Sequence, residues 1–326
     1  MQGKDLNRRQ ALGAATATVL TGAAAGCATS PPTATAAPAK RPMAFNDPIW
    51  NREVSARIEA CADPKKWVYG WVSGVVCGVR ENEKVRPLMR FDVFSTIRVV
   101  RREDGSYQRL CRELVFYRDL KTGALMDEWD NPYTGERVKV VDVANDPYNY
   151  VISDFYPDPP SYGGLNQEQK PPRRPYIRNW SIIDENTIGL ESDIHLYYPS
   201  AMQPEKWPRE SPGKMTRVSE QFRYFIRKED LENPTLDHIP AHGVWTRVTP
   251  WLPWMLMDQA PGHILYTGNM CAREHLELHP KDVVARVRER YPKYLVAPEK
   301  VEGPSLSSLE RYALEQKPAQ ARGKQR

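Results

Sequence analysis

Apolar and polar residues alternate along several successive segments of the chain, and this period of two constrains the fold more than any other feature. An extended strand points successive side chains to opposite faces, whereas a helix repeats about every 3.6 residues. The alternating segments are residues 88–100, 108–118, 137–143, 187–198 and 215–227. Residues 67–79 are apolar on both faces and contain Gly70, Gly74 and Gly78, which is typical of a buried, bent strand.

Short turn sequences join these segments. Asp104-Gly105 lies between two of them and is a strong hairpin signal, and residues 119–123, 131–135 and 184–186 have the same role. Strands joined in this way form an antiparallel meander, and closing the meander removes its exposed edges. We therefore predict a mainly β fold, with the antiparallel meander closed or curved into a calycin-like barrel. Short terminal helices are expected at residues 48–60, after the N-cap Asp47, and after Pro280.

The first 27 residues resemble an export signal. Arg8 and Arg9 precede an Ala-rich stretch, residues 11–25, that is too short and too weakly apolar to span a membrane. Residues 7–13 resemble the twin-arginine export motif, and an ordinary secretion signal that contains two arginines is the alternative.

Cys27 is the candidate lipidation site. It follows Ala24-Ala25-Gly26, which is similar to a bacterial lipobox, and plain cleavage nearby is the alternative. The predicted organisation is a signal over residues 1–27, a disordered tether over 28–46, a single β-rich domain over 47–300 and a polar basic tail over 301–326. We expect a periplasmic or envelope-anchored protein.

Charge and cysteine content limit the partners. The formal net charge is +5, and no long basic block lies outside the tail, so no nucleic-acid partner is expected and membrane contact is expected only through the lipid anchor. Cys61, Cys77, Cys111 and Cys271 are widely spaced, and disulfides and buried free thiols both remain open. The nucleotide, zinc-protease and serine-hydrolase motifs are absent, so the cofactor is unknown. The oligomeric state also stays open.

One strand face carries the candidate catalytic residues Glu191, Asp193, His195 and Tyr197, at intervals of about 6.8 Å. If this face points into a barrel, a carboxylate and an imidazole could act as an acid–base pair. If it points outward, it is a solvated strand face. His275, Glu277 and His279 share the spacing of a metal site, but Pro280 interrupts the segment, so no metal site is predicted.

Tryptophans provide the candidate ligand-binding residues, which are Trp129, Trp245, Trp251 and Trp254. Pro250 and Pro253 prevent a regular element around the last two, so bulky rings lie on a loop there. Such a loop either fills the end of a barrel as core or lines the mouth of an apolar pocket.

Four motifs in order resemble one uncharacterised family, called domain of unknown function 1838. They are residues 127–136 (Asp-Glu-Trp-Asp-Asn-Pro-Tyr-Thr-Gly-Glu), residues 145–147 (Asn-Asp-Pro), residues 243–247 (Gly-Val-Trp-Thr-Arg), and residues 251–257 (Trp-Leu-Pro-Trp-Met-Leu-Met) with Pro261-Gly262. The resemblance covers residues 48–298. It implies a protein of a kind that is widespread in proteobacteria and often carries a twin-arginine signal. No activity can be carried over from this family.

Three classes of function fit these observations. The first is an exported, envelope-associated β-barrel that binds a small apolar, aromatic or amphipathic molecule. The second is a cofactor-independent isomerase or lyase that uses acid–base residues in the same cavity. The third is a structural or protein-interaction module. Whether the protein is an enzyme stays open.

Overall fold

The computed structural model describes residues 39–145, 149–158, 160, 162 and 172–320. The chain divides into residues 1–37 and 38–326, and only the second unit is considered below. The predicted signal, Cys27 and the first part of the predicted tether lie outside the described residues. No helix in the described part of the chain is both long enough and apolar enough to cross a membrane.

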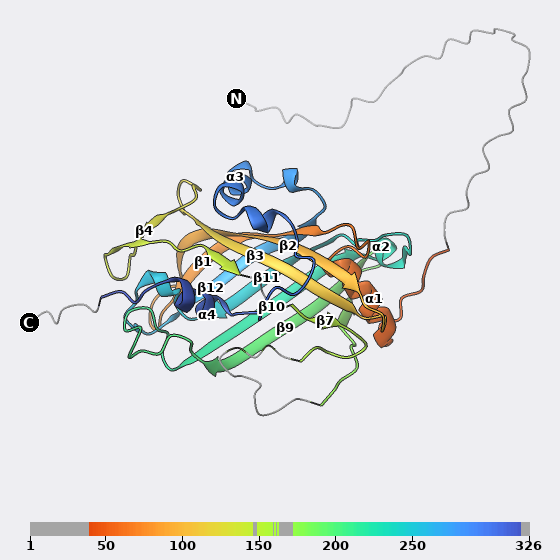
Figure 1. Cartoon of the computed structure of the whole chain (residues 1–326), viewed down its shortest axis with the longest axis horizontal. Helices are drawn as coiled ribbons and strands as arrows, with labels where there is room; N and C mark the ends of the chain where they lie inside the picture. The colour runs from red at the N-terminus through yellow and green to blue at the C-terminus, as the bar shows by residue number, and fades with distance from the viewer. Residues whose placement is uncertain (1–38, 146–148, 159, 161, 163–171, 321–326) are drawn as a thin grey trace, which may run out of the picture. The chain divides into compact units, whose positions relative to one another are not determined.

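Ten strands form one antiparallel sheet among the described residues (Figure 1). They are β1 (Val68–Val79), β2 (Arg86–Arg101), β3 (Tyr107–Arg118), β6 (Val143–Asn145), β7 (Val151–Ile152), β8 (Asn179–Ile182), β9 (Thr187–Pro199), β10 (Met215–Arg227), β11 (Ala241–Thr249) and β12 (His263–Arg273). Their spatial order is β6-β3-β2-β1-β12-β11-β10-β9-β8, and β7 also pairs with β3. The hairpin of β4 (Glu128–Asp130) and β5 (Arg137–Lys139) is separate. The predicted mainly β fold and the antiparallel meander are confirmed.

Turn and glycine chemistry explain the local geometry of the long strands. Gly105 has a φ of +81° in the β2–β3 hairpin, and the Ser106 amide donates to Asp104 Oδ1 at 3.0 Å. In β1, a Cβ atom at Gly74 would lie 2.0 Å from the carbonyl oxygen of Thr267 in β12. The two backbones can approach so closely only because position 74 has no side chain.

The helices and 3₁₀ turns are α1 (Pro48–Glu59), α2 (Lys228–Glu232), η2 (Pro253–Met255), η3 (Leu276–Leu278), α3 (Lys281–Arg290), η4 (Pro292–Leu295) and α4 (Ser308–Glu315). The helix predicted over residues 48–60 is found as α1, and Asp47 caps it by accepting from the Ile49 amide at 2.9 Å. The helix predicted after Pro280 is found as α3.

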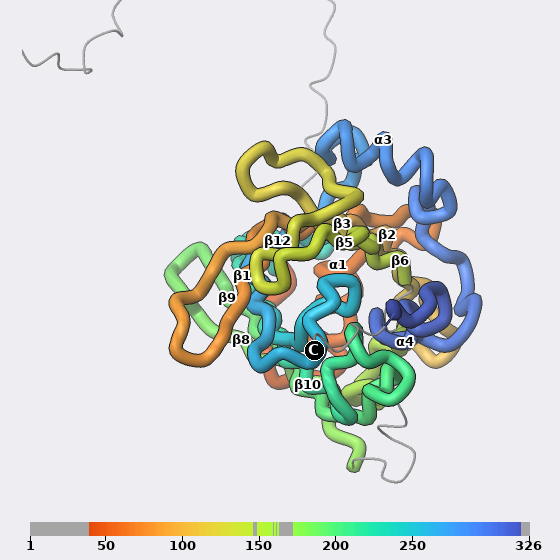
Figure 2. Tube along the Cα trace, turned by 90° about the vertical axis from the view of Figure 1, so that its left-hand side faces the viewer, coloured from red at the N-terminus to blue at the C-terminus, as the bar shows by residue number. Residues whose placement is uncertain are grey.

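The sheet is curved, and α1 lies inside the curve (Figure 2). Trp50 of α1 shares an apolar cluster with Ile188 and Leu190 of β9, whereas Ala56 shares another with Val99 of β2. Because β9 and β2 are far apart in the strand order, the helix connects the two halves of the sheet. We call the face of the sheet that is directed toward α1 the inner face.

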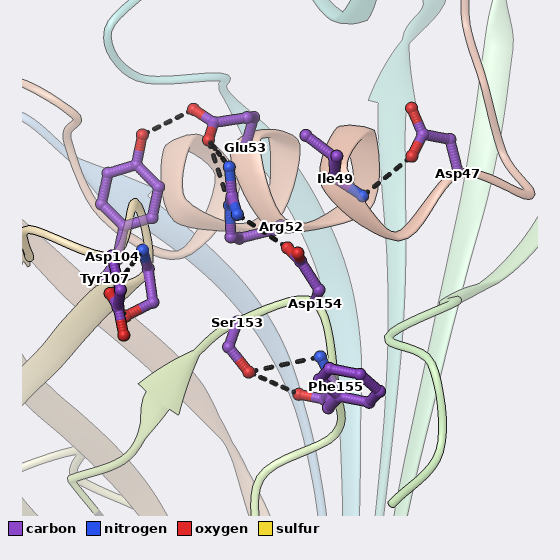
Figure 3. Close-up of polar contacts among 10 residues, drawn as sticks. Asp47, Ile49, Arg52, Glu53, Asp104, Tyr107, Ser153, Asp154 and Phe155 are labelled. Carbon is purple, nitrogen blue, oxygen red and sulfur yellow. Dashed lines mark hydrogen bonds and ion pairs between the residues drawn. The ribbon is translucent and has the colours of Figure 1, made fainter.

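Closure into a barrel is not found. The described strands form an open path that ends at β8 on one side and β6 on the other, so the predicted ring of hydrogen-bonded strands is unconfirmed. Polar contacts of α1 connect it to the strands near one of these edges. Glu53 accepts from the Tyr107 hydroxyl of β3 at 2.6 Å, and Arg52 Nη1 donates to Asp154 Oδ1, just after β7, at 2.7 Å (Figure 3).

The outer face of β1, β2 and β3 is covered by the C-terminal part of the chain. Val283 and Val287 of α3, with Tyr294 of η4, share an apolar cluster with Phe94 of β2 and Phe116 of β3. This second layer explains why β2 is buried on both faces. The alternating residues of β2 therefore do not divide into a solvent-exposed face and a buried face.

Both ends of the predicted β-rich domain extend further than the sequence indicates. Phe45, in the predicted tether, stacks against Trp180 with ring centroids 5.4 Å apart. In the predicted solvated tail, Ser307 and Glu310 form a capping box at the start of α4, and Tyr312 contacts Trp207. Phe45 and Tyr312 bury aromatic surface against the domain, so the described parts of both segments pack against it. Cys61, Cys77, Cys111 and Cys271 form no disulfide.

The position of α1 inside the sheet predicts a large cost for truncating its core residue. Trp50 is 1% exposed, so Trp50→Ala should lower the free energy of unfolding by about 3–5 kcal/mol in urea denaturation. Ile49, the next residue, is 50% exposed, and Ile49→Ala should cost less than about 1 kcal/mol. Equal costs for the two variants would contradict a helix embedded in the sheet.

Candidate functional site

The predicted catalytic residues lie on the outer, solvent-exposed face of β9. Tyr197 is 56% exposed, and Asp193 Oδ1 accepts from Arg223 Nη1 of β10 at 2.6 Å. Glu191 lies 3.9 Å from the same guanidinium, and His195 is exposed. The enclosed orientation that an acid–base site at these positions requires is therefore not the one found.

The two-residue period of β9 explains why these four side chains face solvent. Ile188 and Leu190 of β9 pack toward α1, so the odd-numbered positions that follow must point outward. The predicted alternation is found, but the polar residues lie on the solvent-exposed face, as they do in most half-buried strands.

All four predicted ligand-binding tryptophans are buried members of one apolar core cluster. Trp254 packs edge-on against Trp129 and Tyr117, with ring centroids 5.8 and 5.2 Å away. Trp251 contacts Tyr133 and donates from its indole N–H to the Ala260 carbonyl at 2.9 Å. Of the two expectations for this loop, the core arrangement is the one observed for these rings.

His279 is also a core residue. Its ring packs edge-on against Tyr69, Trp71 and Phe94, and burial, with the positive charge of Arg273, lowers its pKa to about 4. Within the described ranges, no three or more His, Cys, Asp or Glu side chains are grouped so that they could hold a metal ion.

A different set of polar side chains meets on the inner face. The pairing of β10 with β11 puts Glu220 opposite Arg247 and Phe222 opposite Trp245. On β3, Glu113 shares its face with Tyr107, which contacts α1, and with Tyr117, which contacts Tyr266 of β12. We call this set the inner-face cluster; its members are Glu113, Tyr117, Glu220, Trp245, Arg247 and Tyr266.

Glu220 is held in place by neighbours from β11. Its Oε2 accepts from the Trp245 indole N–H at 3.0 Å, and its Oε1 lies 3.7 Å from Arg247 Nη1. The Trp245 ring contacts Phe91 and Tyr266, with centroids 5.7 and 5.5 Å away. The Tyr117 and Tyr266 hydroxyls are 3.2 Å apart. The cluster therefore combines fixed aromatic rings with fixed polar groups.

Glu113 and Arg247 have fewer hydrogen-bond and ion-pair partners than their neighbours on the inner face. In the described part of the chain, Glu113 makes no side-chain hydrogen bond or ion pair, and Arg247 donates no hydrogen bond. The Nε atom of Arg247 is buried without a partner, whereas its side chain as a whole is 26% exposed. A buried polar atom without a partner is costly, so the Nε atom of Arg247 needs water or a ligand.

The two carboxylic acids of the cluster have different environments. Burial raises the pKa of Glu113 to about 7, and the negative charge of Glu220 acts in the same direction, while Arg247 and Arg109 partly oppose both effects. Glu220 has a cation and a donor beside it. Two carboxyl groups in contrasting environments are a common arrangement for acid–base chemistry.

The inner-face cluster was missed because its members are distributed over four strands. The available signal was Glu113, a charged residue in phase with Cys111, Val115 and Tyr117 in an alternating segment whose two faces are both largely apolar. Of the predicted residues, Trp245 alone belongs to the cluster.

The fold and cluster define a class of protein: a curved antiparallel sheet with an internal helix and a charged, aromatic inner face. Residues 64–315 match the family described as "Protein of unknown function (DUF1838)", and the chain belongs to this family. The match includes every member of the inner-face cluster. No curated protein matches the chain significantly.

The raised pKa of Glu113 predicts a pH-dependent stability. The folded state holds the Glu113 proton up to about pH 7, whereas the unfolded chain releases it near the ordinary value of 4.5. The stabilisation that wild type has relative to Glu113→Gln should therefore be complete below pH 4.5 and decrease until about pH 7. Its size should be on the order of 2 kcal/mol, because solvent reaches part of the carboxyl group.

Chemical denaturation of both proteins at matched pH values measures this difference, and all other titrating groups cancel in it. A difference that is constant between pH 4.5 and 7.5 would contradict a raised pKa.

Proposed function

We propose that the inner face of the sheet binds a small molecule with an apolar or aromatic body and a polar group, and that the protein is an exported, envelope-associated binding protein. One observation carries the proposal: Arg247, whose Nε atom is buried without a partner, and Glu113, whose side chain has no partner among the described residues, lie among aromatic side chains on the inner face. Ligand sites typically combine an apolar lining with a few convergent polar groups. The partner is then a small amphipathic molecule.

The two ends of the inner face differ from its centre. Val99, near one end of β2, clusters with α1, whereas Met89, near the other end, clusters with Trp251 and Trp254. We infer that α1 and the tryptophan loop close these ends, so that the open sheet encloses a ligand as a barrel would. Trp251 and Trp254 then form one end of the site.

Two serine variants test the binding site. Ser192 of β9 lies opposite Phe222 and is in phase with Leu190 on the inner face, whereas Ser219 of β10 lies opposite His195 on the outer face. Ser192→Trp should fill the space beside Phe222 and reduce ligand retention by roughly tenfold or more, because a bulky ring excludes the ligand. Ser219→Trp, the matched control, should retain ligand as wild type does.

The measurement is incubation of the whole protein with a hydrophobic cell extract, gel filtration, and mass spectrometry of the retained molecules. Retention that is equal in both variants, or absent in wild type, would contradict an inner-face site.

A second candidate function is a cofactor-independent isomerase or lyase. Glu113 favours it, because an acid whose pKa is near 7 can both accept and donate a proton at neutral pH. Glu113 and Glu220 then take the role that the sequence assigns to Glu191, Asp193, His195 and Tyr197. In the same experiment, an enzyme would return chemically altered molecules, and Glu113→Gln would retain them unaltered.

Export is proposed from residues outside the described part of the chain. Replacing Arg8 and Arg9 with lysine should leave the precursor in the cytoplasm, because the twin-arginine route requires both guanidinium groups. Cys27→Ala should release exported protein from the membrane fraction and leave export itself intact. Cell fractionation and immunoblotting measure both effects, and normal export of the double-lysine variant would contradict the twin-arginine signal.

A further inference from the structure

Arg247 differs from the other arginines of the inner face. Arg109 and Arg178 are both paired with Glu59 of α1, at 3.1 and 3.2 Å. Arg247 has only the longer, 3.7 Å contact with Glu220, and its Nε atom is buried without a partner. Its planar group of donors is therefore the part of the inner face that is most ready to bind an oxyanion.

The charges on the inner face balance only in one protonation state. The groups that carry them are Arg109, Arg178, Arg247, Glu59, Glu113 and Glu220. When Glu113 is protonated, three arginines face two carboxylates, so one positive charge is in excess, and Arg247 has the longest of the three ion pairs. A ligand with one negative charge would restore the balance.

The other groups around Glu113 do not supply this charge. The remaining titratable groups whose charges couple to Glu113, Glu220 or Arg247 are Tyr117, Tyr162, Tyr198 and Tyr266. The tyrosines are neutral at neutral pH, since burial raises the pKa of each. The charge of Glu310 acts on Tyr162 and Tyr198 instead of on these three groups, and its carboxylate accepts from the Ser307 amide in the α4 capping box.

We propose that the ligand of the inner face is an organic monocarboxylate, whose carboxylate pairs with Arg247 and whose apolar body lies against Phe222 of β10 and Trp245 of β11. The proposal rests on the proposed binding function and specifies its ligand. A single arginine matches a single negative charge, whereas a phosphate ester would need more cations. Protonated Glu113 donates to the bound carboxylate, and ionised Glu113 repels it.

Three probes that share one aromatic body test the proposal: 2-naphthylacetate, 2-(2-naphthyl)ethanol and 2-(2-naphthyl)ethylamine. Equilibrium dialysis of the full chain should give roughly tenfold tighter binding of the acid than of the alcohol at pH 6, with the amine weakest. Between pH 6 and 8.5 the affinity for the acid should fall by roughly tenfold as Glu113 ionises, while the affinity for the alcohol stays constant. Decanoate should bind as the aromatic acid does if the body need only be apolar.

Variants assign these effects to residues. Arg247→Gln should remove the preference for the acid and leave binding of the alcohol unchanged. Glu113→Gln should keep the preference and remove its pH dependence. Arg223→Gln, on the outer face of β10, is the matched control and should alter neither. The pH profile of wild type supports the proposal independently if Arg247→Gln fails to fold.

Each of the remaining outcomes would contradict either the ligand class or the binding function. Equal binding of acid and alcohol, tightest binding of the amine, or a preference that survives in Arg247→Gln would overturn the monocarboxylate and leave the binding function standing. If wild type binds none of the probes, the proposed binding function fails together with this inference.

Discussion

Glu59, in the last turn of α1, forms ion pairs with Arg109 of β3 and with Arg178, the residue that precedes β8. An acidic residue at a helix C-terminus meets the negative end of the helix dipole, so it needs cations nearby. Both arginines supply that charge, and they come from opposite ends of the strand order. The ion pairs therefore hold a curved, open sheet around the helix without a complete ring of backbone hydrogen bonds. The curvature that brings β3 near β10 and β11, and so assembles the inner-face cluster, depends on this arrangement.

The inner face is divided along the strands. At one end α1 fills it, and at the other end the tryptophan loop packs against β1, β2 and β12. Between them, Glu113, Glu220 and Arg247 remain partly accessible. Apolar burial at the two ends stabilises the fold, and the centre can then hold charged groups whose burial is unfavourable. The separation of stabilising and polar regions is typical of binding proteins whose site lies within a sheet.

Residue patterns predicted most of the secondary structure. The alternation located β2, β3, β9 and β10, Asp104-Gly105 located a hairpin, and Asp47-Pro48 located α1. These features depend on interactions between residues close in the chain, so local sequence is sufficient for them. The packing of Phe45 and the docking of α4 were not predicted, because each depends on contacts between distant segments, and closure of the sheet by hydrogen bonds stays unconfirmed. Which face of β9 would be enclosed was left undecided for the same reason.

The sequence by itself therefore determined the antiparallel meander, the α1 helix and the family, because period, turn residues and motifs are local properties. The tertiary structure decided that Glu191, Asp193, His195 and Tyr197 face solvent and that Glu113 faces Glu220 and Arg247. The sequence of a strand does not show which of its two faces will be covered, because that depends on the elements that pack against it. The raised pKa of Glu113 arises in the same way, because burial and the charge of Glu220 act on it only after β3 and β10 have been brought together.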